Sequence, residues 1–252
     1  MEEPLHGKVA LIAGGAGGIG AATAKLLAAR GALVIVNYLK NEAAAKRVVA
    51  EIHTNRQLAV AVQADVREPE HVKTMVESIL EENERIDIMI DSVSSSSFVK
   101  PFAEMTWDEF IWGVQRELQA AFELTKAVLP AMQKQHYGRL VYISSGLSKA
   151  PTMPGSISIG TAKAGLGAFA RYIAREYGSY GITANVVSPG MVETELSSHM
   201  PAEQKQRVTS MTPLGRIAQP EDIARAIAFF ASDDSGFLTG TYMPVNGGIS
   251  ME

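Results

Sequence analysis

Short runs of apolar, often β-branched residues alternate along the chain with longer segments whose apolar residues recur at helical spacing. An apolar run of roughly four to eight residues between turn residues indicates a buried strand, and apolar positions three or four apart indicate a helix. We expect strands at residues 9–13, 33–37, 58–64, 86–90, 139–144, 182–187 and 242–245. Helices are expected between them, the first two at residues 18–30 and 42–53.

The strands are continuously apolar, and this pattern is typical of a parallel sheet that helices cover on both faces. We therefore predict a single-domain α/β fold, a Rossmann-type doubly wound parallel sheet, over residues 1–252. No linker, repeat or low-complexity segment divides the sequence, and a chain of this length can bury a substantial core.

Composition and charge exclude several functions. The net charge of −4 disfavours nucleic acid or an anionic membrane as partner. The chain has no cysteine, which excludes disulfides and thiolate chemistry, and its five histidines show no metal-binding spacing, so we expect no metal. The N-terminus lacks the basic and apolar regions of a secretory signal, and no apolar run is long enough to span a membrane. A cytoplasmic protein is expected.

A glycine cluster joins the first strand to the first helix. Glycines there let the backbone turn tightly and approach a pyrophosphate, which the amide groups and dipole of the helix N-terminus attract. The strand before and the helix after supply the context that this motif requires. The residues expected to bind phosphate are Gly14, Gly15, Gly18, Ile19 and Gly20.

The spacing of Gly14, Gly18 and Gly20 resembles the Gly-x-x-x-Gly-x-Gly loop of the short-chain dehydrogenase/reductase family. Further segments are similar to family motifs in the order seen in 3-oxoacyl-carrier-protein reductases: 64–66, 138–145, 163–166, 185–194, 213–216, 220–224 and 238–248. The resemblance implies an NAD(P)(H)-dependent oxidoreductase. It also implies cofactor contacts from Asn37, Tyr38, Lys40, Asp65, Val66, Ser92, Val93, Lys163, Pro189, Gly190, Val192 and Thr194.

The end of the second strand bears on the choice between NAD(H) and NADP(H). An NAD site usually places a carboxylate there, but Asn37 and Tyr38 are not acidic, and Lys40 could bind a 2′-phosphate. Against this, Gly17 stands where many NADP-binding relatives carry a basic residue, and Lys40 also fits a solvated loop charge. We expect NADP(H) in slight preference to NAD(H).

The family's active site contains Asn, Ser, Tyr and Lys, and this chain departs from it. Ser145 and Lys163 match, but Ile159 stands at the tyrosine position and Glu117 at the asparagine position. The family's Asn-Asn-Ala-Gly segment is here 91–94, Asp-Ser-Val-Ser. An aliphatic side chain cannot exchange the proton that the tyrosine hydroxyl supplies.

Replacement groups are therefore sought nearby. Ser156 lies where some enoyl reductases of the family place the tyrosine, and it shares a helical face with Lys163. Ser156 or Ser158 could therefore present a hydroxyl near the cofactor. Both serines also fit a second interpretation, in which they cap the N-terminus of the helix. Glu117 is either a surface glutamate or a direct partner of Lys163 in place of a bound water. The candidate catalytic residues are Ser145, Lys163, Glu117 and Ser156.

Other titratable residues have simpler interpretations. Tyr137 and Tyr142 are interpreted as packing residues, and His199 as a solvated loop histidine. Residues 195–212 are expected to form a substrate lid with flexible apolar residues, namely Leu196, Met200, Val208 and Met211, facing Met153. Such side chains suit a hydrophobic substrate, although self-packing of the lid explains them equally. The C-terminal pattern resembles the family's oligomerisation surface and implies a homodimer or homotetramer.

Three functions remain open. The first is a reductase of an acyl-type carbonyl or a conjugated enoyl substrate. Hydride addition to the enoyl substrate gives an enolate, which needs no immediate proton donor, whereas hydride addition to a ketone gives an alkoxide, which does. The second is a non-redox lyase, isomerase or cyclase on the same scaffold. The third is a catalytically silent, cofactor-binding homologue. The altered segment 91–94 counts against every cofactor-dependent function.

Overall fold

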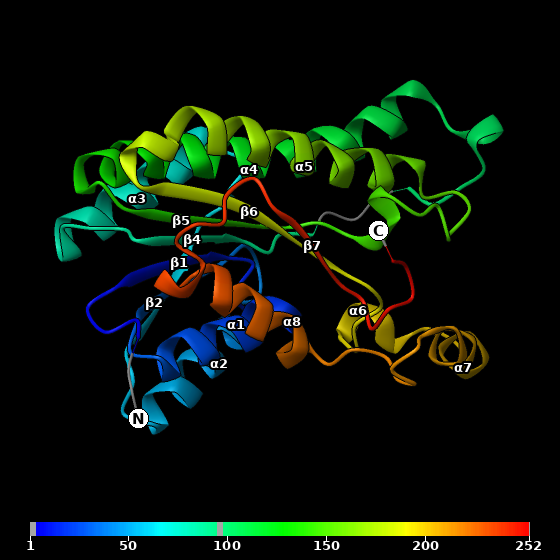
Figure 1. Ribbon diagram of the computed structural model, residues 1–252, viewed down its shortest axis with the longest axis horizontal. Coiled ribbons are helices and arrows are strands. Elements are labelled where there is room, and N and C mark those ends of the chain that lie inside the picture. The colour runs from blue at the N-terminus through cyan, green and yellow to red at the C-terminus, as the bar shows by residue number, and fades with distance from the viewer. Residues whose placement is uncertain (1–3, 95–97, 252) are drawn as a thin grey trace.

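The computed structural model describes residues 4–94 and 98–251. In this part of the chain, parallel strands form one seven-stranded sheet of order β3-β2-β1-β4-β5-β6-β7 (Figure 1). The strands are β1 (Val9–Ala13), β2 (Leu33–Tyr38), β3 (Ala59–Gln63), β4 (Ile88–Asp91), β5 (Gly138–Ile143), β6 (Ile182–Pro189) and β7 (Tyr242–Val245). The predicted doubly wound parallel sheet is confirmed.

Helices cover both faces of the sheet, and α6 and α7 lie at one end (Figure 1). The helices are α1 (Gly18–Ala29), α2 (Glu42–Thr54), α3 (Pro69–Asn83), α4 (Trp107–Gln135), α5 (Ile157–Tyr177), α6 (Glu195–Ser198), α7 (Ala202–Met211) and α8 (Pro220–Phe230). One core cluster joins the sheet to α1, α2 and α8, and the other joins it to α3, α4 and α5. The apolar strands serve both clusters, which explains why their burial is continuous.

The predicted strand positions are confirmed within about two residues, and the start of β4 shows why they differ. The backbone amide of Ile86 donates to the Gln135 side chain at 3.1 Å, and the same side chain donates back to the Ile86 carbonyl at 3.0 Å. Ile86 is fully buried, but its backbone therefore bonds outside the ladder, and β4 begins at Ile88.

The strand order places the candidate site. The chain runs outward from β1 through β2 to β3, then returns to β4 on the other side of β1. At such a switch point the loops after neighbouring strands diverge and leave a crevice at the carboxyl ends of the strands. The glycine loop follows β1 and Ser92 follows β4, so both border this crevice.

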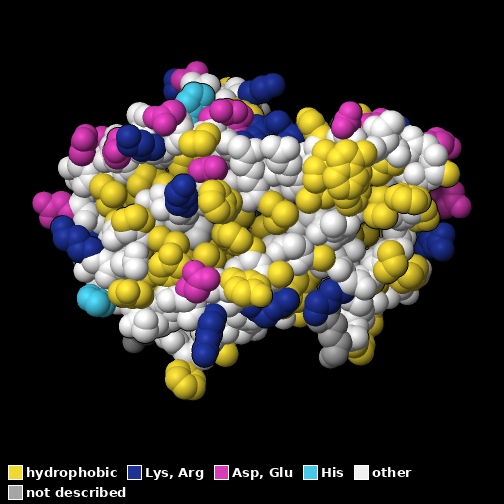
Figure 2. Space-filling model, turned by 90° about the horizontal axis from the view of Figure 1, so that it is seen from above, with side chains coloured by type: hydrophobic (Ala, Val, Ile, Leu, Met, Phe, Trp, Pro, Cys, Tyr) yellow, Lys and Arg dark blue, Asp and Glu magenta, His cyan; other side chains and the backbone are white. Residues whose placement is uncertain are grey.

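Helices α4 and α5 pack closely along one face. A Cβ on Gly165 of α5 would lie 3.1 Å from the Leu118 side chain, and the Ser158 hydroxyl donates to the Phe110 carbonyl at 2.8 Å. A capping box at Thr106 and Glu109 begins α4. Figure 2 shows hydrophobic side chains spread over the outer face on this side of the sheet. Large exposed apolar residues of α4 and α5 are Trp107, Trp112, Phe122, Ile157 and Tyr172.

A buried carboxylate ties β1 to β4, and its removal should destabilise the fold. Asp87 is fully buried, accepts from the Val9 amide at 2.9 Å and forms two bonds with the Arg85 guanidinium at 2.8 and 2.6 Å. We predict that Asp87→Ala lowers the free energy of unfolding by roughly 3 kcal/mol, because a strand amide and a cation lose their partner. Urea denaturation at pH 7 measures the change.

The control is Glu42→Gln, which breaks the exposed pair between Glu42 and Lys46 and should cost no more than about 0.5 kcal/mol. Equal stability losses in the two variants would contradict a structural role for Asp87.

Candidate active site at the carboxyl edge of the sheet

A pocket of about 780 Å³ lies at the carboxyl ends of the central strands. Most of the sequence-predicted cofactor residues line it: Gly14, Gly18, Ile19, Asn37, Asp65, Val66, Ser92, Val93, Lys163, Pro189, Gly190, Val192 and Thr194. Gly15, Gly20, Tyr38 and Lys40 do not line it. The pocket also includes Ser145 and Ile159, so the candidate phosphate loop and the candidate reaction centre share one cavity.

The glycine loop has a shape that larger residues would prevent. Gly14 has φ of +73°, and a Cβ there would lie 2.8 Å from the Ser92 carbonyl oxygen. A Cβ on Gly20 would lie 2.1 Å from the Gly14 carbonyl oxygen, so Gly20 supports the loop from behind rather than lining the pocket. The first turn of α1 has no acidic residue and no side-chain cap, and its amide groups suit an anion.

The opposite end of the pocket is built by β2 and the loop after β3. The Asn37 amide donates to the carbonyls of Val62 and Ala64 at 3.3 and 3.2 Å, which fixes the end of β2. Asp65 accepts from the Arg67 guanidinium at 2.6 and 2.8 Å, and these hydrogen bonds hold the pKa of its carboxyl below the ordinary value despite partial burial.

The basic residue that was predicted to bind the cofactor at this end, Lys40, does not line the pocket. Lys40 is exposed and lies outside the pocket wall, whereas Arg67, which the sequence reasoning did not select, lines it. Tyr38 packs into the core cluster that contains α1 and α2. The signal for Arg67 was present in the sequence, because it directly follows the segment 64–66, which was assigned to the cofactor.

At the reaction centre, Ser145 caps a short 3₁₀ turn over Gly146–Ser148, and its Oγ accepts from the Leu147 amide at 3.2 Å. This hydrogen bond leaves the hydroxyl proton available to a ligand in the pocket. Ile159 lines the same pocket one helical turn before Lys163. An aliphatic wall therefore stands where the resemblance calls for a proton donor.

Lys163 is held by a buried ion pair. Its ammonium contacts Glu117 Oε1 directly and donates to the Ile143 carbonyl at 2.7 Å. Glu117 and Lys163 are only 6% and 7% exposed, so the predicted pair between α4 and α5 is confirmed and the interpretation of Glu117 as a surface residue is wrong. Lys163 lines the pocket, and Glu117 lies behind it.

A second carboxylate, which the sequence reasoning did not place here, adds to this pair. Asp91 ends β4, is 3% exposed and accepts from the Val93 amide at 3.2 Å. Burial, followed by repulsion from Glu117, raises the pKa of Asp91 to about 7, although Lys163 and the Val93 amide oppose the shift. The difference from the family pattern at residues 91–94 was visible in the sequence. The burial of Asp91 near Glu117 was not, because it depends on the packing of α4 against β4.

The two serines near the start of α5 do not cap it with their side chains. Ser156 occupies the N-cap position, yet its side chain makes no capping bond, and its buried Oγ has no hydrogen-bond partner. It lines a neighbouring cavity of about 350 Å³ instead of the main pocket. The Ser158 hydroxyl binds α4, as described above, so the capping interpretation is wrong for both hydroxyls.

Of the two tyrosines interpreted as packing residues, Tyr142 lies in the core, whereas Tyr137 is only half-buried. Tyr142 is fully buried with its hydroxyl 2.8 Å from Thr125, and the Tyr137 hydroxyl donates to Asp233 at 3.0 Å. The sequence reasoning missed Tyr242, whose hydroxyl donates to Ser188 Oγ at 2.8 Å and to the Ser145 carbonyl at 3.3 Å. Tyr242 thus supports the Ser145 turn from behind the pocket wall.

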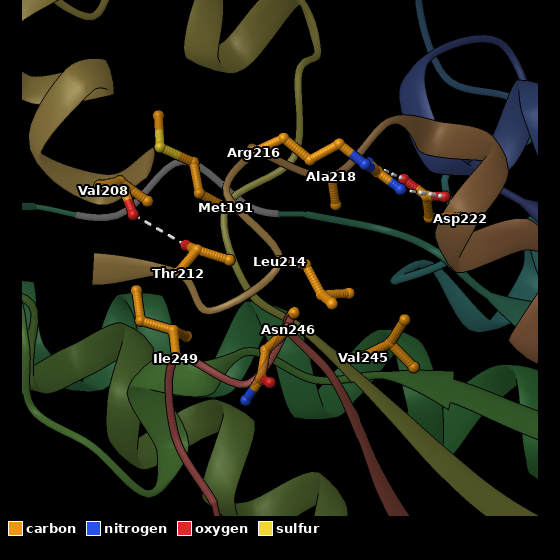
Figure 3. Close-up of a pocket in the computed structure, with 11 residues that line it drawn as sticks. Met191, Val208, Thr212, Leu214, Arg216, Ala218, Asp222, Val245, Asn246 and Ile249 are labelled. Carbon is orange, nitrogen blue, oxygen red and sulfur yellow. Dashed lines mark hydrogen bonds and ion pairs between the residues drawn. The ribbon is translucent and has the colours of Figure 1, made fainter. Parts of the chain in front are cut away.

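The expected lid divides into two parts. Glu195, Ser197 and Met200, from α6 and the turn after it, line the main pocket. Val208 of α7 lines a separate cavity of about 260 Å³, which Figure 3 shows with the ion pair between Arg216 and Asp222 at its edge. Met153 lines the main pocket, His199 is exposed, and the side chain of Leu196 lies outside the described part of the structure.

Within residues 4–94 and 98–251, no three His, Asp or Glu side chains form a group that could hold a metal. In the same ranges, no helix is long and apolar enough to cross a membrane.

Comparisons with known proteins agree with this geometry. Residues 14–250 match the family described as enoyl-(acyl carrier protein) reductase. The chain is 34% identical over 245 residues to a 3-oxoacyl-[acyl-carrier-protein] reductase of Haemophilus influenzae, covering 97% of this chain and 99% of that protein. It is 34% identical over 244 residues to an acetoacetyl-CoA reductase of Allochromatium vinosum, with coverage of 97% and 99%. A crystal structure of a dehydrogenase/reductase from Sinorhizobium meliloti superposes with a TM-score of 0.90 at 30% identity, covering 98% of this chain and 96% of the other.

The raised pKa of Asp91 should make stability depend on pH. Because the folded pKa of about 7 exceeds the ordinary value of 3.8, the folded state holds a proton that the unfolded state has released between these pH values. The free energy of unfolding should therefore fall as pH rises from about 4 to about 7, by at most about 1.4 kcal/mol per pH unit from this group. Urea denaturation at pH 5, 6, 7 and 8 measures it.

The comparison variant is Asp91→Asn, which cannot titrate. Subtracting its stability from that of the wild type removes the contribution of other groups, and the difference should decline with pH. A difference that is flat from pH 5 to 8 would contradict the raised pKa.

Proposed function

Because the chain belongs to the short-chain dehydrogenase/reductase family, we propose that this oxidoreductase uses NAD(P)(H) and reduces an acyl-type carbonyl or conjugated enoyl substrate at an atypical site. One observation carries the proposal: Ser145 and a Lys163 ammonium fixed by Glu117 face the pocket beside an aliphatic Ile159. The relatives named for 3-oxoacyl and acetoacetyl-CoA substrates support an acyl-type substrate.

The residues of the pocket suit a nicotinamide dinucleotide. The uncapped start of α1 and the loop at Gly14 would hold the pyrophosphate, Asn37 and Asp65 lie where the adenosine would bind, and Lys163 would hold the nicotinamide ribose. When bound, the cofactor supplies hydride. NADP(H) is proposed in preference to NAD(H) because β2 does not end in an acidic residue that could bind the ribose hydroxyls. Lys40, which was expected to bind a 2′-phosphate, does not line the pocket and so no longer supports this preference.

The absence of a tyrosine favours a conjugated substrate. Hydride addition to a ketone leaves a localised alkoxide, which needs a proton at once in a pocket of low polarity. Addition to the β-carbon of an enoyl thioester leaves a delocalised enolate, which the Ser145 hydroxyl and the Lys163 ammonium can stabilise before protonation. The residues present therefore fit enoyl reduction better than ketone reduction.

A second candidate function is a lyase, isomerase or cyclase that moves protons without hydride. Asp91 and Glu117 favour it, since a buried carboxyl group whose pKa is raised, next to a second buried carboxylate, suits proton transfer. The intact glycine loop favours the oxidoreductase. A catalytically silent, cofactor-binding homologue would keep that loop but show no turnover.

Two further features complete the proposal. The segment 195–212 is proposed as the substrate lid, with its first part, 195–200, closing over the substrate; Glu195, Ser197 and Met200 in the lining of the pocket and Met153 in its wall support this. The chain is proposed to form a homodimer or homotetramer. The exposed aromatic residues of α4 and α5 support this, because large exposed apolar patches commonly mark interfaces.

The first prediction from this proposed function is that the protein binds NADPH and reduces an enone faster than the matched ketone. Fluorescence titration with NADPH should saturate below millimolar concentration, and NADPH consumption with the enone should exceed that with the saturated ketone by at least about tenfold. Gly20→Val serves as the control, since its side chain would collide with the Gly14 carbonyl and should abolish binding. No binding by the wild type at millimolar NADPH would eliminate the oxidoreductase.

The second prediction concerns the missing hydroxyl. Ile159→Tyr should raise ketone reduction by about 100-fold, because the phenol enters the pocket one turn from Lys163. Ile159→Phe is the matched control, with the same ring and no hydroxyl. Steady-state NADPH oxidation with the ketone measures both variants, and a Tyr variant no faster than the Phe variant would show that the remaining site cannot use a tyrosine.

A further inference from the structure

Three buried ionisable side chains, each from a different element, lie close enough behind the candidate reaction centre for their charges to act on one another. Asp91 ends β4, Glu117 comes from α4 and Lys163 from α5, and none is more than 7% exposed. The charged groups that act on Asp91 are Glu117 and Lys163. The neighbouring strands add no further charge, because its register partners are Ala13 on β1 and Tyr142 on β5, and the Tyr142 hydroxyl is bound to Thr125.

This arrangement has one positive charge for two carboxylates. If both acids were ionised, a net negative charge would lie in a region nearly without solvent, where an unpaired charge is strongly disfavoured. One additional proton makes the cluster neutral. Glu117 contacts the positively charged ammonium directly, whereas Asp91 accepts a hydrogen bond from the neutral Val93 amide. The proton therefore belongs on Asp91.

We propose that Asp91, Glu117 and Lys163 hold one exchangeable proton and deliver it to the pocket through Lys163, in place of the hydroxyl that Ile159 lacks. The delivery step rests on the proposed function, whereas the binding of the proton does not.

The route follows from which atoms reach the pocket. Of the three residues, Lys163 alone lines it. An N–H bond of its ammonium breaks as a C–H bond forms at the α-carbon of the enolate, whose electron pair makes the new bond. Lys163 is left neutral and regains a proton as the O–H bond of Asp91 breaks, directly or through Glu117. Asp91 is then an ionised carboxylate and recovers a proton from hydronium in the solvent, so each turnover consumes one solvent proton and the step needs no other reactant.

The proton can be observed without cofactor or substrate. Infrared spectra of the protein should show the C=O stretch of a protonated carboxyl that persists to near pH 7, where exposed acids are ionised. The band should shift in D₂O and be absent from Asp91→Asn. In Glu117→Gln the loss of a negative charge should move its titration to lower pH. Glu109→Gln, which removes an acid of low pKa at the surface, is the control and should leave the band unchanged.

A wild type without this band, or the same band in Asp91→Asn, would overturn the proposal. Kinetics then test delivery: below pH 7, Asp91→Asn should reduce the enone at least about tenfold more slowly and lose the decline of rate with rising pH. A variant with the wild-type rate and pH profile would overturn delivery. A protein that shows the infrared titration but reduces no substrate would support the bound proton and contradict the proposed function.

Discussion

The buried ion pair between Lys163 and Glu117 determines how this site is built. Taking both charges out of water is costly, and such a pair persists only when its geometry is good and further hydrogen bonds satisfy the remaining protons. Here the Ile143 carbonyl binds the ammonium and the close packing of α4 on α5 fixes both ends. The lysine is thereby held at the pocket wall by the protein's own side chain, where the family pattern uses an asparagine and a water.

Asp91 changes the consequence of this pair. An ion pair alone would be neutral and would exchange no proton near neutral pH. A second buried carboxylate makes the cluster bind a proton in this range. The parallel sheet enforces the placement, because Asp91 lies at the carboxyl end of β4 beside the crevice. Two buried carboxylates therefore lie behind the lysine, while the aliphatic Ile159 forms the pocket wall beside it.

Much of this could be predicted from the sequence, since local patterns carry it. Continuous apolar strands predicted the parallel sheet, and the glycine spacing predicted the loop after β1. For Glu117 the sequence left two interpretations open, a surface residue or a partner of Lys163, and the packing of α4 on α5 decides between them. The rest depends on packing between distant segments. Ser156 occupies the N-cap position, but its hydroxyl makes no capping hydrogen bond with the helix amides. Lys40 follows β2 as expected, yet Leu39 and Arg67 line the pocket and Lys40 does not. Tyr242 supports Ser145 across a sequence separation that no local pattern reveals.

We infer that hydride reaches a conjugated carbon while the proton comes from the buried cluster. The most direct measurement is the position of label after reduction of an enoyl thioester in H₂O with NADPH deuterated at the transferred position. If hydride adds to the β-carbon and the α-carbon is then protonated, the product carries deuterium at the β-carbon and ordinary hydrogen at the α-carbon. A product without deuterium, or deuterium at a carbonyl carbon, would contradict it.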